Sequence, residues 1–326
     1  MSPNGLAPKS VSGSGLPNLQ RGFDFYSWLT FIAMNSPADG TTIGKGPRPG
    51  GDALTKWEDL DNYRPLASVM LSNGAKPEWG TRIVPEPCKA LDGPGKIVFQ
   101  LGEEAFNQPF KSGPLIDQDG NFALFNILMN HPMFDYIFEH RLYSKAGQEQ
   151  FDGRIEFPIG KNPTTDGNAQ VAAGKMGAIM LKVSYRILDP EKDKELMRQF
   201  HTADALIYFP GPPATRTGPA CVEKMLGLIG FHVGHKTTFA PQWVWSSFEH
   251  VSNAPDASDI GTSRGVSTRI PTTPRYLPGL RIFAARLTAS SLSFPVAFRI
   301  VSSLAFGENC GMGLGRFLLS VSPRFS

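Results

Sequence analysis

The chain has 326 residues, of which 41% are hydrophobic and 19% charged, a normal globular balance that excludes disorder over its whole length. Its 34 glycines and 28 prolines are nearly a fifth of all residues, so we expect long loops and short helices. The fold class that follows is β-rich α+β: an antiparallel sheet with a few short covering helices and long loops. No stretch reaches the about 20 apolar residues that a membrane-spanning helix needs, so we expect no membrane span.

The net charge of +3 is unevenly distributed along the chain. Up to position 260 there are 24 basic and 28 acidic residues, whereas the last 66 residues contain eight arginines, one glutamate, and neither lysine nor aspartate. The body is therefore mildly acidic, and the basic character lies in the C-terminal part. An arginine-rich tail that binds nucleic acid or an anionic surface is one interpretation. Because such tails usually contain lysine and fewer apolar residues, we expect no nucleic-acid partner.

The N-terminal part predicts a leader followed by a helix. Residues 1–21 are rich in Gly, Ser and Pro, which indicates a flexible leader without the apolar segment of an export signal. Asp24 is expected to cap a helix that ends near residue 35. Its buried stripe is expected to consist of Phe25, Trp28, Leu29 and Ile32.

The middle of the chain alternates loops with short elements. The glycine-rich loop 39–52 lacks the GxxxxGK signature of a phosphate-binding loop. Residues 53–95 are polar and proline-rich, and a long irregular segment of this kind is either a packed extension or the rim of a functional site. The DQDG at 117–120 resembles a calcium loop but lacks the other ligand positions, so we expect a tight turn that leads into a strand. Asn130 is expected to cap a helix over residues 132–143.

Strands are predicted to dominate the second half of the chain. We expect a short strand at 154–158, a half-buried alternating strand at 177–188, a charged turn or short helix at 189–198, and a strand at 202–209. The strands at 177–188 and 202–209 are expected to pair with each other.

The densest block of strand-forming residues predicts a hairpin over residues 226–237 and 242–251, with a loop of about four or five residues. The hairpin is expected to join the same antiparallel sheet as the preceding strands, and the two helices should cover one face of that sheet.

This hairpin contains the HVGH sequence, in which His232 and His235 are three positions apart. On a helix this spacing would place both imidazoles on one face, but on a strand it places them on opposite faces, so we expect no metal site. Gly230 and Gly234 lie two residues to either side of His232. They leave room for another group beside it.

The register of the hairpin decides what faces His232. If Ser247 lies opposite, Glu249 and Trp245 share the face; if Phe248 does, His250 shares it. A pair of His232 and Glu249 could serve acid/base chemistry or orient a ligand, and a structural histidine is the alternative. A Ser–His–acid triad is not expected, because the strained GxSxG turn is absent. The candidate ligand or site face consists of His232, His235, Lys236, Trp243, Trp245, Glu249 and His250.

Three cysteines, Cys88, Cys221 and Cys310, cannot all pair with one another, and none stands in a CxxC arrangement. A disulfide between Cys88 and Cys221 is the pairing we expect if the protein is exported. Free buried thiols are the alternative.

Several blocks resemble a family of poorly characterised, mostly exported bacterial proteins that are labelled cytochrome c family proteins. The matching blocks lie within about residues 22–256: FDFYSWLTFIAMNSPADG, GPLIDQDGNFALFNILMN, LKVSYRIL, LGLIGFHVGHKT and PQWVWSSFEHVSNAP. The last two are the most specific. The resemblance implies a periplasmic or secreted protein with a redox-associated role and redox proteins as partners. It also implies a C-terminal CxxCH motif that attaches haem c.

That motif is absent from this chain as written, so we expect no cofactor here. The match ends near residue 256, where lysine and aspartate disappear, and the following residues look like DNA translated in a shifted frame. We therefore expect a single globular β-rich domain at 22–256 and an atypical Arg/Ser-rich tail at 257–326. The leading function is an exported, redox-associated accessory protein. The alternatives are a ligand-binding β-rich module that uses Trp243, Trp245 and His232, and an enzyme centred on His232 and Glu249.

Overall fold

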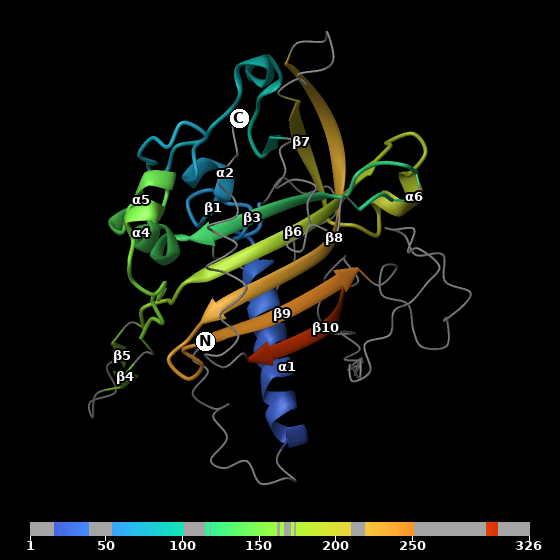
Figure 1. Ribbon diagram of the computed structural model, residues 1–326. Helices are drawn as coiled ribbons and strands as arrows, with labels where there is room; N and C mark the ends of the chain where they lie inside the picture. Colours follow the sequence, from blue (N-terminus) through green and yellow to red (C-terminus); the bar gives the residue numbers. More distant parts are fainter. Residues whose placement is uncertain are drawn as a thin grey trace, which may run out of the picture.

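The computed structural model describes residues 16–38, 54–100, 115–117, 119–161, 164–165, 171–172, 174–209, 219–250 and 298–305, and shows the predicted β-rich α+β fold (Figure 1). The strands of its main sheet are β1 (Tyr63–Pro65), β2 (Ile97–Gln100), β3 (Leu124–Asn130), β6 (Ile179–Leu188), β7 (Thr202–Phe209), β8 (Ala220–Lys236), β9 (Trp243–His250) and β10 (Phe298–Ala305). The helices are α1 (Leu16–Met34), α2 (Leu66–Val69), the 3-10 helix η2 (Glu86–Leu91), α4 (His131–Glu139), α5 (Lys145–Gln150) and α6 (Lys194–Met197). A separate small sheet consists of β4 (Thr164–Thr165) and β5 (Val171–Ala172).

The main sheet has the strand order β1-β3-β6-β8-β7-β2, with β9 and β10 continuing from β8. Its pairs are antiparallel, as predicted, except for β2 at one edge, which runs parallel to β7. A parallel neighbour needs a long connection. Here β2 and β7 are separated by about a hundred residues that include β3 and β6.

Strand β8 is the centre of the sheet, and the predicted pairing of β6 with β7 is wrong because β8 lies between them. Of its 17 residues, those from Met225 to His235 pair along one edge with β6. Along the other edge the first half of β8 pairs with β7 and the second half with β9. Strand β8 therefore pairs with two different strands along this edge, first with β7 and then with β9. The sheet curls as a result (Figure 1).

Helix α1 covers one face of the sheet. Its first residue and the set of side chains that it buries differ from the prediction. It begins at Leu16, so it includes the end of the segment expected to be a flexible leader. Phe31 and Met34 are buried and the predicted Trp28 packs against the same core, whereas Phe25 is 54% exposed. Ser27 lies on the buried side of the helix, and its Oγ is 2.7 Å from Oγ of Ser246 on β9. A small residue at this point lets the helix approach the sheet closely.

The other face of the sheet is covered at one end by α2 and α4. Asn130 caps α4 as predicted: its Oδ1 accepts a hydrogen bond from Met133 N at 3.3 Å. The same Oδ1 accepts from Ile179 N at 2.9 Å, so the cap also fixes α4 to β6. The helix ends at Glu139, earlier than the predicted residue 143.

Four local predictions have different outcomes. The tight turn is confirmed, since Asp117 Oδ1 accepts from the backbone N–H groups of Asp119 and Asn121. Residues 154–158 form no strand, and only Lys194–Met197 of the segment 189–198 is helical. Strand β6 is buried on both faces rather than half-buried. The core that includes α1 covers one face, and the hydrophobic cluster that includes α4 covers the other.

One part of the segment predicted to lie outside the globular domain does join the sheet. Phe298–Ala305 forms β10, which pairs antiparallel with β9 and lies against α1. Its sequence FRIVSSLA is rich in β-branched and apolar residues, which suits an edge strand. The other residues of the predicted tail at 257–326 and the glycine-rich loop at 39–52 lie outside the described residues. No helix in the described part of the chain is both long and apolar enough to span a membrane.

Candidate functional site

The hairpin of β8 and β9 has the first of the two registers considered, with His232 opposite Ser247. Nδ1 of His232 lies 2.9 Å from Oγ of Ser247, and its Nε2 lies 3.7 Å from Oε1 of Glu249. Burial, together with the nearby charge of Lys182 on β6, lowers the pKa of His232 to about 4. The imidazole is therefore neutral at neutral pH.

The two glycines leave room beside His232, as expected. A Cβ at Gly230 would lie 2.9 Å from Ser184 Oγ and 3.3 Å from Glu249 Oε2. A Cβ at Gly234 would lie 3.2 Å from the rings of Trp243 and Trp245. The glutamate carboxylate and the two indoles occupy this space.

The other predicted site residues divide between the two faces of the sheet. Lys236 shares the face of His232, with its Nζ 5.8 Å from the centre of the Trp243 ring. His235 points to the α1 face, where its Nδ1 is hydrogen-bonded to Oη of Tyr26. His250 also lies on that face, where its Nε2 donates to Gln199 O at 3.0 Å. The predicted site face is thus split, and HVGH is no metal pair.

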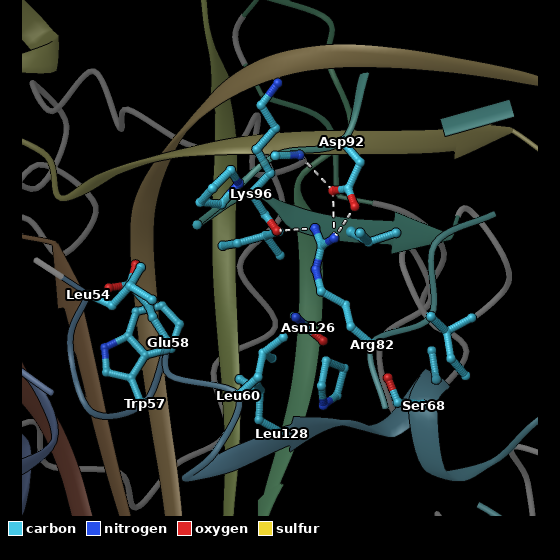
Figure 2. A pocket seen from close by; sticks show the side chains of 18 of the residues that line it. Leu54, Trp57, Glu58, Leu60, Ser68, Arg82, Asp92, Lys96, Asn126 and Leu128 are labelled. Atoms are coloured by element: carbon cyan, nitrogen blue, oxygen red, sulfur yellow. Dashed lines mark hydrogen bonds and ion pairs between the residues drawn. The ribbon is translucent and has the colours of Figure 1, made fainter. Parts of the chain in front are cut away.

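The structure places a second candidate site on the α1 side of the sheet, a cavity of about 450 Å³ that the sequence analysis did not single out (Figure 2). Its lining comprises Leu54, Trp57, Glu58, Leu60, Pro65, Ala67, Ser68, Arg82, Ile83, Pro85, Asp92, Gly93, Pro94, Gly95, Lys96, Ile97, Val98, Asn126 and Leu128. Most of these side chains are apolar. The charged groups come from the segments before β1 and before β2.

The curl of the sheet creates this cavity. Ile97 and Val98 of β2 line it together with Asn126 and Leu128 of β3, although β6, β8 and β7 separate β2 from β3 in the sheet. Two strands so far apart in the order can face one cavity only where the sheet bends around it. Mouths of curled sheets and barrels are common places for ligands.

A buried ion pair lies at one wall of the cavity. Oε1 of Glu58 is 2.6 Å from Nε2 of His201, while its Oε2 accepts from N and Oγ1 of Thr55. Burial alone would raise the pKa of Glu58, but His201 and the Thr55 hydrogen bonds outweigh it, so this pKa is lowered. Burial would lower the pKa of His201, but Glu58 outweighs it, so this pKa is raised. Each group therefore favours the charged form of the other.

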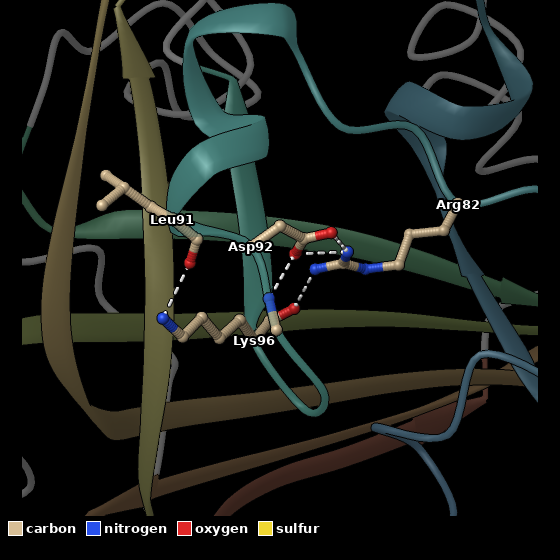
Figure 3. A network of polar contacts seen from close by, with 5 residues as sticks. Arg82, Leu91, Asp92 and Lys96 are labelled. Atoms are coloured by element: carbon tan, nitrogen blue, oxygen red, sulfur yellow. Dashed lines mark hydrogen bonds and ion pairs between the residues drawn. The ribbon is translucent and has the colours of Figure 1, made fainter.

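The rim of the cavity is fixed by a polar network in the loop before β2 (Figure 3). The guanidinium of Arg82 pairs with the carboxylate of Asp92 and donates to Lys96 O at 2.8 Å. The hydrogen bonds from Arg82 lower the pKa of Asp92. Lys96 Nζ in turn pairs with Glu223 on β8 at 2.7 Å.

A disulfide anchors the same loop. Cys88 of η2 is bonded to Cys221 at the start of β8, with 5.1 Å between their Cα atoms, which is the pairing expected for an exported protein. The rim is therefore tied covalently to the central strand. One feature of the sequence pointed to the cavity: the long irregular segment 53–95, which was interpreted as a packed extension or the rim of a functional site.

Taken together, the fold and cavity define a curled, disulfide-bonded β-rich protein with one lined cavity among its described residues. Comparisons of the chain with protein-family models, with curated proteins and with solved structures found no match. Among the described residues, no group of three or more His, Cys, Asp or Glu side chains is arranged to hold a metal ion.

Proposed function

We propose that the protein is an exported ligand-binding protein that holds a small, mainly apolar molecule in the cavity between β2 and β3. The observation that carries this proposal is the cavity, whose volume of about 450 Å³ lies within the roughly 300–1,000 Å³ of small-molecule pockets. Its rim is restrained before any ligand arrives, and a restrained site loses less conformational entropy on binding.

The lining indicates the chemistry of the ligand. Leu54, Leu60 and Leu128 offer apolar contact, whereas Glu58 and Asn126 are polar side chains on the walls (Figure 2). A carboxylate accepts hydrogen bonds and an amide both accepts and donates them. The ligand we expect has an apolar body and at least one hydrogen-bond donor.

Export of the protein from the cytoplasm is part of the same proposal. Disulfides persist in oxidising compartments, so the Cys88–Cys221 bond supports a periplasmic or secreted protein. Alkylation of the native, unreduced protein with iodoacetamide should modify neither Cys88 nor Cys221, and both should react after reduction. Modification of either one before reduction would argue against export.

The resemblance to cytochrome c family proteins adds a redox-associated accessory role with redox proteins as partners, and we keep that role as part of the proposal. Covalent haem does not fit this chain. Attachment needs two closely spaced cysteines followed by histidine, whereas Cys88 and Cys221 are bonded to each other and Cys310 has no such neighbours. No haem chemistry is therefore assigned to it.

Binding can be tested with a neutral apolar fluorophore such as N-phenyl-1-naphthylamine. Fluorescence titration should give a saturable signal, and the probe should raise the melting temperature. Ala67 lies on the cavity wall and is exposed, so Ala67→Trp should fill the cavity without disturbing the core and should abolish both effects.

Ala75→Trp provides the matched control, because Ala75 is also exposed but does not line the cavity. It should bind the probe as the unmodified protein does. Equal binding by the Ala67→Trp variant would contradict the proposal.

A further inference from the structure

A second arrangement of reactive groups lies on the face of the sheet that carries His232. Ser247, His232 and Glu249 come from the adjacent strands β8 and β9 and point to the same side, because Ser247 and Glu249 are two residues apart on one strand. The His232 side chain is 31% exposed and that of Glu249 is 23% exposed. Molecules in solution can therefore reach the group.

The spacing assigns a distinct role to each residue. Glu249 lies beside Nε2 of His232, and a carboxylate there favours the tautomer with its proton on Nε2. Nδ1 then carries a lone pair and accepts the hydrogen bond from the Ser247 hydroxyl at 2.9 Å. A neutral imidazole hydrogen-bonded to a serine hydroxyl is the arrangement in which histidine can act as a general base.

From this geometry we infer a nucleophilic site that cleaves small carboxylic esters, with Ser247 as nucleophile, His232 as base and Glu249 as the group that orients the imidazole. The inference is independent of the ligand-binding cavity, which lies on the opposite face of the sheet. The serine stands on an extended strand instead of a strained turn, so a GxSxG motif is not required.

The reaction proceeds in two balanced steps. Oγ of Ser247 attacks the ester carbonyl carbon while its proton passes to Nδ1 of His232. The bond to the alcohol oxygen breaks, and the leaving alcohol takes that proton. Water then attacks the acyl-serine, its proton passes through Nδ1 back to Oγ of Ser247, and the carboxylic acid leaves.

Neighbouring side chains suit an uncharged, partly apolar ester. Lys182 lies opposite His232 in the β6–β8 register, and its Nζ is 4.6 Å from the centre of the Phe125 ring. Burial lowers the pKa of this lysine to about 8, so it is mostly charged at neutral pH. A cation near a carbonyl that develops negative charge stabilises the tetrahedral intermediate. Trp245, one step along the same face from Ser247, offers apolar contact.

The test uses p-nitrophenyl acetate as substrate and a fluorophosphonate as covalent probe. Ser247→Ala should lower hydrolysis at least 10-fold and abolish fluorophosphonate labelling, and peptide mapping of the unmodified protein should place the label on Ser247. His232→Gln should also lose labelling. Melting temperatures of all variants establish that they are folded.

Ser246→Ala is the matched control, since Ser246 is the preceding residue on the same strand but is buried on the opposite face against Ser27. It should retain both hydrolysis and labelling. Ala67→Trp, which fills the cavity, should retain them too, so the two proposals can fail separately. Hydrolysis by Ser247→Ala at the rate of the unmodified protein, or a label mapped to another residue, would overturn the inference.

Discussion

Glu58 and His201 are 143 positions apart in the chain, yet Oε1 of the first lies 2.6 Å from Nε2 of the second. Their side chains are only 7% and 12% exposed. Glu58 lies in a segment that lines the cavity, and His201 directly precedes β7, so the pair connects the cavity wall to the sheet. Because a buried charge is costly without its partner, the pair fixes the cavity wall to the sheet and makes it sensitive to pH.

The pair should contribute most to stability between pH 4.5 and 6.5, the ordinary pKa values of the two groups. The pKa of Glu58 is lowered, so its contribution is full above 4.5 and is lost as pH falls through the folded-state pKa. The pKa of His201 is raised, so its contribution is full below 6.5 and is lost as pH rises through the folded-state pKa.

His201→Gln leaves Glu58 buried without a cationic partner and should cost about 3–5 kcal/mol of unfolding free energy at pH 5.5. Urea unfolding at pH 5.5 and 8.5 measures this cost. The loss relative to the unmodified protein should be smaller at pH 8.5. A cost that is the same at both pH values would show that the pair is not ionised as described.

His235 should make the protein sensitive to acid. Burial lowers its pKa to about 4, so its contribution is full above pH 6.5 and is lost as pH falls through 4. His235→Gln can keep a hydrogen bond to Tyr26 but cannot take up a proton, so the fall in unfolding free energy between pH 6.5 and 4 should become shallower.

Reduction of the Cys88–Cys221 disulfide should lower the unfolding free energy by about 4–5 kcal/mol, as expected for a bond between residues 133 positions apart. It should also weaken fluorophore binding, because η2 and the cavity rim are no longer tied covalently to β8. Urea unfolding and fluorescence titration with and without dithiothreitol measure both effects. Unchanged affinity after complete reduction would show that the rim is held by the Arg82 network alone.

Gly230→Ala should disturb the site around His232 more than the fold. The added Cβ would lie 2.9 Å from Ser184 Oγ and close to the Glu249 carboxylate, so the carboxylate must move. We expect a cost of about 1–3 kcal/mol and a lower rate of ester hydrolysis. Gly93→Ala, where the nearest atom would be 3.6 Å away, should change neither quantity.

The parts of the fold that could be predicted from the sequence are those set by neighbouring residues. The Asn130 cap, the Asp117 turn and the hairpin of β8 and β9 depend on residues a few positions apart. The place of β8 between β6 and β7 depends on contacts between distant segments, and local periodicity contains no information about them. The buried side of α1 was predicted only in part. Trp28 packs against the core but Phe25 is exposed, because that side faces the contact of Ser27 with Ser246, 219 positions away.

The same difference between local and distant contacts explains which candidate site could be predicted. The residues around His232 were found because they lie on one hairpin, and only its register was left open. The cavity was not found because its walls come from irregular segments and from two strands that the curl of the sheet brings together. Glu58 lies in a segment without periodicity, and its partner His201 follows much later in the chain.

Ligand binding in the cavity is the central claim, and photo-crosslinking tests it most directly. An apolar probe that carries a diazirine is irradiated with the protein, and the labelled peptides are identified by mass spectrometry. We expect the label on the cavity segments 54–68 and 82–98, and we expect it to disappear in Ala67→Trp but not in Ala75→Trp. Labels concentrated outside these segments, or unchanged by Ala67→Trp, would contradict the account.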